Sequence, residues 1–186
     1  MTRPVAEADP HLAFTDEARL AEEIATRAER RSRTERAAEV ATWAGTLHDL
    51  AERELAAVIR LDGGRSYRGR IAAVGVDHIA IRTSGGTLAL VLREAIRAVR
   101  PEPGLRAPVA TGDRERSVGR NLEEILLRLS EDGIRVSLVL QGLDEPLSGH
   151  VLGLGEDVIT LRVEAGDQGI VYLPAAALRA VIVEGW

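Results

Sequence analysis

The sequence contains an internal repeat, which restricts the fold more than any other feature. Four residues recur at positions displaced by 80, namely Gly69, Asp77, Ile79 and Arg82 as Gly149, Asp157, Ile159 and Arg162. A second set, Arg97-Ala98-Val99, recurs as Arg179-Ala180-Val181 at a displacement of 82. The second copy therefore has two extra residues, which fall in the segment that spans 83–87 in the first copy and 164–168 in the second. Insertions are tolerated best in turns. We therefore expect two copies of one structural unit, each with a turn at this point.

Hydrophobic periodicity predicts the same elements in both copies. A helix capped by Thr15 is expected over 16–44, with a polar centre at 29–36 that must face solvent or a partner. Short helices are expected over 46–55, capped by Thr46, and 122–130, capped by Asn121. Alternating apolar residues predict strands over 57–62, 67–76, 78–83, 87–92, 96–99, 135–141, 147–154, 158–163, 169–173 and 178–183.

The predicted fold class is α+β and mainly β. An N-terminal helix is followed by two tandem five-stranded small barrels, each preceded by a short helix. The expected domains are a tail and exposed helix over 1–45, a first barrel over 46–104, a linker over 105–120 and a second barrel over 121–186. Gly69 and Gly149 lie inside the second strand of each copy, where glycine marks a bend or a close backbone approach.

The first copy carries a pattern that resembles the Sm-like (LSm/Hfq-like) family. It has an apolar strand ending in a turn at Asp62-Gly63, a glycine within the next strand at Gly69, and Asp77 before the third strand. The resemblance covers about two thirds of the chain and implies Sm-like barrels with RNA-binding ability; SH3-like and PRC barrels remain alternatives. The base-binding residues of the family do not carry over. His78-Ile79-Ala80 lacks the family's Asn, and Arg93-Glu94 stands where Hfq-like proteins have Lys-His.

The charge is distributed unevenly between the copies. The net charge is −5, but 57–106 has 9 Arg against 4 acidic residues, whereas 134–186 has 3 Arg against 7. A basic first copy suggests contacts with phosphate groups, for which a solvated charged surface is the alternative. The candidate nucleic-acid-binding residues are Arg60, Arg65, Tyr67, Arg68, Arg70, His78 and Arg82. The scarcity of aromatic residues counts against single-strand binding, because stacking platforms are usually needed.

No residue pattern predicts an enzyme. Asp77 and Asp157 are interpreted as structural turn residues that accept bonds from nearby backbone N–H groups, rather than as catalytic acids. The four histidines lack metal-ligand spacing, so neither a metal nor another cofactor is expected. The absence of cysteine, of a long apolar run and of a signal-like N-terminus predicts a cytoplasmic protein without a membrane segment.

Two functions follow as hypotheses. The first is a non-enzymatic tandem Sm-like binding or assembly protein with weak single-stranded RNA binding through the first copy. The alternative is a protein–protein interaction scaffold, whose barrels serve oligomerisation and whose helix at 16–44 recruits a partner. Self-association is expected in both cases. Each small barrel leaves one strand edge that is usually covered by pairing with another barrel, so the two copies are expected to pack together, within a chain or between chains.

Overall fold

The computed structural model describes residues 10–102, 110, 112–113, 119–164 and 169–184, and for 10–18 the backbone alone. Two helices, α1 (Pro10–Glu39) and α2 (Trp43–Glu52), precede the first group of strands, and α3 (Leu122–Glu131) precedes the second. The strands are β1 (Ala56–Leu61), β2 (Ser66–Val74), β3 (His78–Thr83), β4 (Leu88–Leu92), β5 (Ile96–Pro101), β6 (Arg135–Leu140), β7 (Leu147–Leu154), β8 (Val158–Val163), β9 (Gly169–Pro174) and β10 (Leu178–Val183). Three short 3₁₀ turns are η1 (Asp62–Gly64), η2 (Arg93–Ala95) and η3 (Ala175–Ala177). We call 43–101 the first half and 122–183 the second half.

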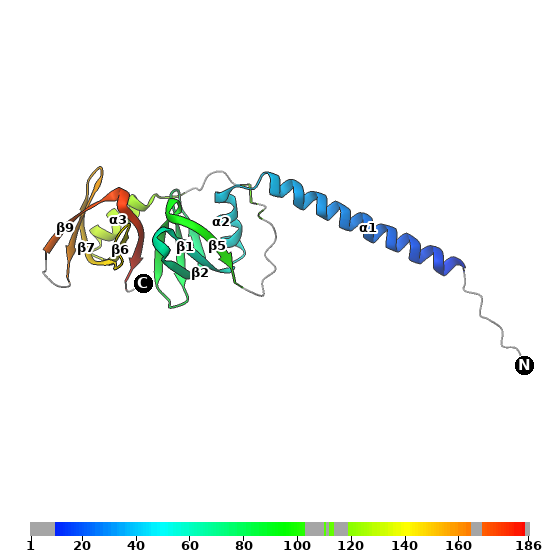
Figure 1. Ribbon diagram of the computed structural model, residues 1–186, viewed down its shortest axis with the longest axis horizontal. Coiled ribbons are helices and arrows are strands. Elements are labelled where there is room, and N and C mark those ends of the chain that lie inside the picture. Colours follow the sequence, from blue (N-terminus) through cyan, green and yellow to red (C-terminus); the bar gives the residue numbers. More distant parts are fainter. Residues whose placement is uncertain (1–9, 103–109, 111, 114–118, 165–168, 185–186) are drawn as a thin grey trace, which may run out of the picture.

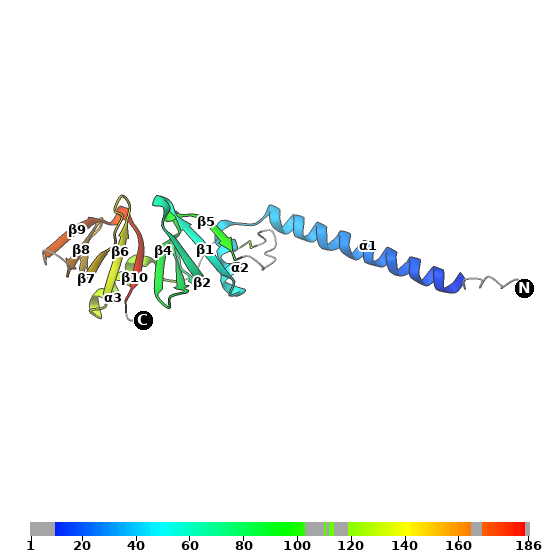
Figure 2. The ribbon, with the colours of Figure 1, turned by 60° about the horizontal axis from the view of Figure 1, so that its bottom comes forward.

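All ten strands form one continuous antiparallel sheet (Figures 1 and 2). Its order is β5-β1-β2-β3-β4-β10-β6-β7-β8-β9, so each half contributes five adjacent strands in the same internal order. The prediction of two separate five-stranded barrels is therefore wrong. The sheet is open, because β5 and β9 each have a partner on one side only.

The two halves are joined where β4 pairs with β10. Val91 lies opposite Ala180, Leu90 opposite Val181, and Leu88 opposite Val183. An unpaired strand edge offers a row of free N–H and C=O groups, and pairing two such edges satisfies them. Edge pairing within the chain thus replaces closure of each half on itself, which explains why two separate barrels do not form.

The hydrophobic cores of the halves interlock at this joint. Ala80 and Leu90, from the first half, belong to the core built mainly from α3 and the strands of the second half. In return, Val139 and Ala180 of the second half belong to the core of the first half. The halves consequently share buried side chains and are not independent units at the joint.

Each half has a short amphipathic helix in an equivalent place. The Asn121 side chain accepts a hydrogen bond from the Glu124 N–H (2.8 Å), which confirms the predicted cap of α3. The cap of α2 is Thr42, whose hydroxyl accepts from the Gly45 N–H (2.9 Å), so the prediction of Thr46 was wrong. Thr46 instead donates its hydroxyl to the Thr42 carbonyl (2.8 Å), which places it one turn inside the helix.

Helix α1 projects away from the sheet along the long axis of the molecule (Figures 1 and 2). It ends at Glu39, before the predicted boundary of 44, and Trp43 begins α2 instead of closing α1. Its apolar residues Leu20 and Ile24 are exposed, as predicted for this end of the helix. In the part of the chain that the structure describes, no helix is long and apolar enough to cross a membrane.

The glycines inside the second strand of each half lie against the neighbouring strand. A Cβ on Gly69 would overlap the carbonyl oxygen of Arg82, and a Cβ on Gly149 would overlap that of Arg162. Only glycine leaves room for this approach of two backbones. The repeated glycine is therefore a packing requirement that both halves share.

Candidate functional site

Several polar side chains bridge the two halves at their joint. The Asp62 carboxylate, in η1, lies 3.0 Å from Arg179 Nε on β10 and 3.4 Å from Arg97 Nη2 on β5. Arg179 also donates to the Gln141 side chain and, over 2.8 Å, to the Ala176 carbonyl. Both Asp62 and Arg179 are mostly buried, so removal of either leaves a poorly solvated charge.

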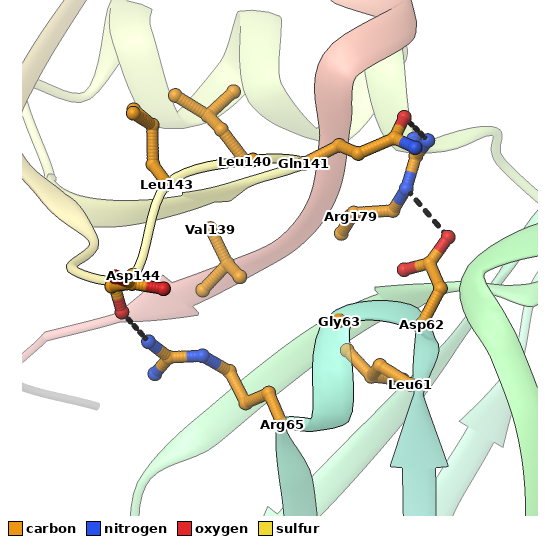
Figure 3. A pocket seen from close by; sticks show the side chains of 11 residues that line it. Leu61, Asp62, Gly63, Arg65, Val139, Leu140, Gln141, Leu143, Asp144 and Arg179 are labelled. Carbon is orange, nitrogen blue, oxygen red and sulfur yellow. Dashed lines mark hydrogen bonds and ion pairs between the residues drawn. The ribbon is translucent and has the colours of Figure 1, made fainter.

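A cavity of about 450 Å³ opens beside this ion pair (Figure 3). On its other side Arg65 donates a hydrogen bond to the Asp144 carbonyl (2.7 Å), which links the turn after β1 to the turn after β6. The remaining lining residues are Leu61, Gly63, Val139, Leu140, Gln141, Gly142 and Leu143. Both arginines of the cavity already bond within the protein, so this cavity lies at a contact that joins the halves and offers a ligand no unpaired arginine.

A second contact between the halves is centred on Asp77. Its Oδ1 accepts hydrogen bonds from His78 Nδ1 (2.9 Å) and from the backbone N–H of Leu122 (2.9 Å). Leu122 is the first residue of α3, whose N-terminal N–H groups have no partner within the helix and attract negative charge. Asp77 thus caps the helix of the other half, a longer-range role than the bonds to nearby N–H groups that the sequence predicted.

The structure divides the seven candidate nucleic-acid-binding residues. Register places Arg70 opposite Arg82, and Arg68 lies two positions from Arg70 on the same face. Arg60 shares this face, since its position on β1 lies opposite Ser66 on β2. All four arginines are exposed. They form what we call the arginine face of the first half: Arg60, Arg68, Arg70 and Arg82.

Two of these arginines are paired with acids. Arg68 Nε lies 2.5 Å from Glu102 Oε1, and Arg70 Nη1 lies 3.9 Å from Glu54 Oε2. The hydrogen bond to Glu102 raises the pKa of Arg68, and the same bond lowers the pKa of the Glu102 carboxyl. Exposed pairs of this kind contribute little to stability, so a phosphate group competes with them readily.

The other three candidates lie elsewhere. His78 begins β3 and is buried beside Asp77, so its ring is not exposed to a nucleic acid. Arg65 lines the cavity between the halves. Tyr67 packs against the core of the first half, its hydroxyl has no hydrogen-bond partner among the described residues, and burial raises its pKa. None of these three belongs to the arginine face.

The corresponding face of the second half is neutralised by its own acids. The Glu164 carboxylate lies 2.8 Å from His150 Nε2 and 2.9 Å from Arg135 Nε. The contact with Arg135 Nε is an ion pair without a hydrogen bond. Glu184 accepts from the Ser137 hydroxyl (2.6 Å) and pairs with Arg135. The first half thus has four exposed arginines on this face, whereas the second half pairs Arg135 and His150 with acids and has Arg162 at the position equivalent to Arg82.

The described residues show no metal-binding group. No cluster of three or more His, Asp or Glu side chains within them is arranged to hold an ion. Asp157, the repeat partner of Asp77, is exposed, and its side chain makes no hydrogen bond or ion pair with any described residue. The repeated aspartates thus differ: one caps a helix and the other faces solvent.

Comparisons with family models and with curated proteins identify no relative. No family model matches the chain, and no curated protein matches it. The function is therefore inferred from the chain's own residues.

Proposed function

We propose that this chain is a non-enzymatic assembly module whose copies join end to end through the free edges of the sheet. The observation that carries this proposal is the pairing of β4 with β10 inside the chain. By the repeat, β9 is the second-half equivalent of β4, and β5 is the first-half equivalent of β10. The edges that remain free are therefore the same kinds of edge as the two already joined.

Burial at equivalent positions supports this proposal. Leu90 on β4 lies opposite Ala80, and Tyr172 on β9 lies opposite Thr160, the repeat partner of Ala80. Leu90 is 4% exposed because the second half covers it, whereas Tyr172 is 71% exposed. Ile170, two residues before Tyr172, is exposed as well. An apolar, uncovered edge strand favours pairing with another strand.

End-to-end association joins unlike surfaces, so its geometry is heterologous. Such contacts close into rings if the rotation per copy permits and otherwise continue as filaments. The net positive first half and net negative second half favour this polarity over contacts between like ends. Helix α1, which projects from the first half, is then available to a protein partner, and recruitment through 16–44 is part of the proposal.

Two further parts of the proposal rest on sequence. A relationship to the Sm-like family is supported by the repeated glycine and aspartate positions and by the identical strand order of the halves. A cytoplasmic location is supported by the absence of cysteine.

Sedimentation velocity over a range of protein concentrations tests the assembly. We expect the mass of the wild type to rise with concentration and the Tyr172→Asp variant to remain monomeric. The double variant Leu20→Ser/Ile24→Ser is the matched control, since it alters exposed apolar residues of α1. A monomeric wild type at every concentration contradicts the proposal. Loss of association in the α1 variant alone would assign self-association to the helix instead.

Single-stranded RNA binding is the second candidate function, and the arginine face supports it. Charge reversal by Arg68→Glu/Arg70→Glu should weaken binding and reduce the slope of log affinity against log salt by roughly 0.7 for each phosphate group that is no longer bound. Arg162→Glu, at the second-half equivalent of Arg82, is the control and should leave binding unchanged. Undetectable binding by the wild type at low salt rejects this candidate.

A further inference from the structure

The loop that contains Asp157 matches the loop that caps α3 within the chain. The Asp77 carbonyl accepts from the Arg93 N–H (2.8 Å), and the Asp157 carbonyl accepts from the Ala175 N–H over the same distance. Arg93 and Ala175 are equivalent, because each opens the 3₁₀ turn after its strand. The two loops thus have the same backbone anchor at their aspartates.

The helix that Asp77 caps has an equivalent at the start of the first half. Leu122 begins α3 and Trp43 begins α2, each directly after its N-cap residue. Leu122 is 2% exposed at the joint, whereas Trp43 is 44% exposed at the free end of the first half. The Thr42 side chain bonds the Gly45 N–H, and none of the described residues accepts a hydrogen bond from the N–H of Trp43.

The surface around Trp43 is a shallow groove. It is lined by Thr42, Trp43, Ala44, Arg93 and Glu94. The equivalent region of the second half, beside Leu122 and Ala175, is where the Asp77 loop lies. The groove differs in its charged side chains: Arg93, which also bonds the Val76 carbonyl, and the acidic Glu94 stand where the second half has Ala175 and Ala176. These two charges offset each other, so the match of loop and groove rests on the equivalence of Trp43 with Leu122 and of Asp157 with Asp77.

We infer that Asp157 of one copy occupies this groove on the next copy and caps its helix α2. The carboxylate accepts from the Trp43 N–H, Arg93 lies beside it, and the Trp43 ring is covered as Leu122 is covered within the chain. This inference rests on the proposed end-to-end assembly and adds the contact that fixes the direction of joining. The occupant is a second copy of this chain, because the matching loop and groove stand at its two free ends.

A double-mutant cycle isolates the inferred hydrogen bond. Proline is tolerated at the first position of a helix and has no N–H, so Trp43→Pro removes both the ring and the donor, whereas Trp43→Ala removes the ring only. Asp157→Ala should weaken self-association about tenfold in the wild type and in Trp43→Ala, because hydrogen bonds to charged groups are strong. In Trp43→Pro, the same substitution should have no further effect. Glu131→Ala, at the far end of α3, is the control and should leave the dissociation constant unchanged.

The outcomes separate this contact from the assembly itself. If the wild type associates but Asp157→Ala weakens it equally in the Trp43→Ala and Trp43→Pro backgrounds, Asp157 does not bind that N–H and the inference is overturned. An unchanged dissociation constant in Asp157→Ala overturns it as well, while the edge-to-edge assembly stands. A wild type that never associates overturns both. Circular dichroism of each variant checks that α2 remains folded.

Discussion

The joined edges and the free edges of the sheet are built from equivalent strands, yet their side chains differ. At the joint, β10 presents Ile182 and Val183 to β4. At the equivalent positions of the free strand β5 stand Arg100 and Pro101. Charged residues and proline on an edge strand weaken uncontrolled pairing. The pairing of β4 with β10 is therefore permanent and apolar, whereas the free ends suit the weaker and reversible contact of the proposed assembly.

The same comparison explains the charge distribution. An apolar joint within a chain needs no selectivity, because its two edges are always held together. Copies that meet in solution gain both rate and direction from opposite charges, which steer encounter and disfavour like ends. The net positive first half and net negative second half fit this requirement.

Aspartate at Leu90 and at its repeat equivalent Tyr172 should distinguish the joined edge, β4, from the free edge, β9, most clearly. Leu90→Asp places an unpaired charge in a buried contact and should lower the free energy of unfolding by about 3–5 kcal/mol. Tyr172→Asp changes an exposed side chain and should alter stability by no more than about 0.5 kcal/mol while it abolishes association. Urea denaturation of both variants measures the difference. Similar losses in the two variants would show that β9 is covered within the monomer.

The glycines inside the second strand of each half should behave alike. Gly69→Ala and Gly149→Ala each force a Cβ against a backbone carbonyl and should cost about 1–3 kcal/mol. The matched control is Gly153→Ala, where an added Cβ meets nothing within 4 Å. This variant should be neutral or slightly stabilising. Thermal unfolding of the three variants measures the effect, and a tolerated Gly69→Ala would mean that β2 and β3 are not as close as described.

The repeated arginines should differ because one lies at the joint. Arg179 is mostly buried and bonds Asp62 across the halves, whereas Arg97 is largely exposed on the free edge. Arg179→Ala should cost about 1–2 kcal/mol, a figure reduced for partial exposure. Arg97→Ala should cost no more than about 0.5 kcal/mol. Chemical denaturation compares the variants, and equal costs would remove the special role assigned to the joint.

Tyr67→Phe should have the smallest effect and a characteristic pH dependence. The hydroxyl is buried without a partner among the described residues, so its removal should be neutral or stabilise by up to about 1 kcal/mol. Because burial raises the pKa of Tyr67, the folded state favours the neutral phenol. Below the unfolded pKa, near 10, the phenol is neutral in both states, so ionisation takes no stability from the wild type. As the pH rises from there through the folded pKa, ionisation of the unfolded state lowers the stability of the wild type. The variant should therefore gain on the wild type above about pH 10, and parallel stability curves would contradict this.

Local structure was largely predictable from the sequence, whereas the assembly of the strands was not. β3, β7, β8 and β10 have the predicted bounds, since alternating apolar residues and the repeat define them. Packing of the two copies through their strand edges was expected, but the particular pairing of β4 with β10 was not, because it joins edges far apart in the chain and periodicity describes one strand at a time. The same pairing buries Leu90 and gives Asp77 a distant helix to cap.

The candidate site was predictable only in part. The shared face of Arg68 and Arg70 follows from strand parity and could be predicted. Their pairing with Glu102 and Glu54 depends on contacts across the fold, as does the burial of His78. The exposure of Tyr172 and Asp157 was the informative signal, and it emerges only when each is compared with its repeat partner in the structure.

A mixing experiment with two variants tests end-to-end assembly most directly. Tyr172→Asp disables the β9 edge, and Ala98→Glu disables the β5 edge at a position whose equivalent, Ala180, is fully buried at the joint. Each variant alone should be monomeric in sedimentation velocity, because neither retains a complementary pair of edges. An equimolar mixture should form a one-to-one dimer and nothing larger, since one intact edge of each kind remains. Dimerisation of the Ala98→Glu variant on its own, through two β9 edges, would contradict the account.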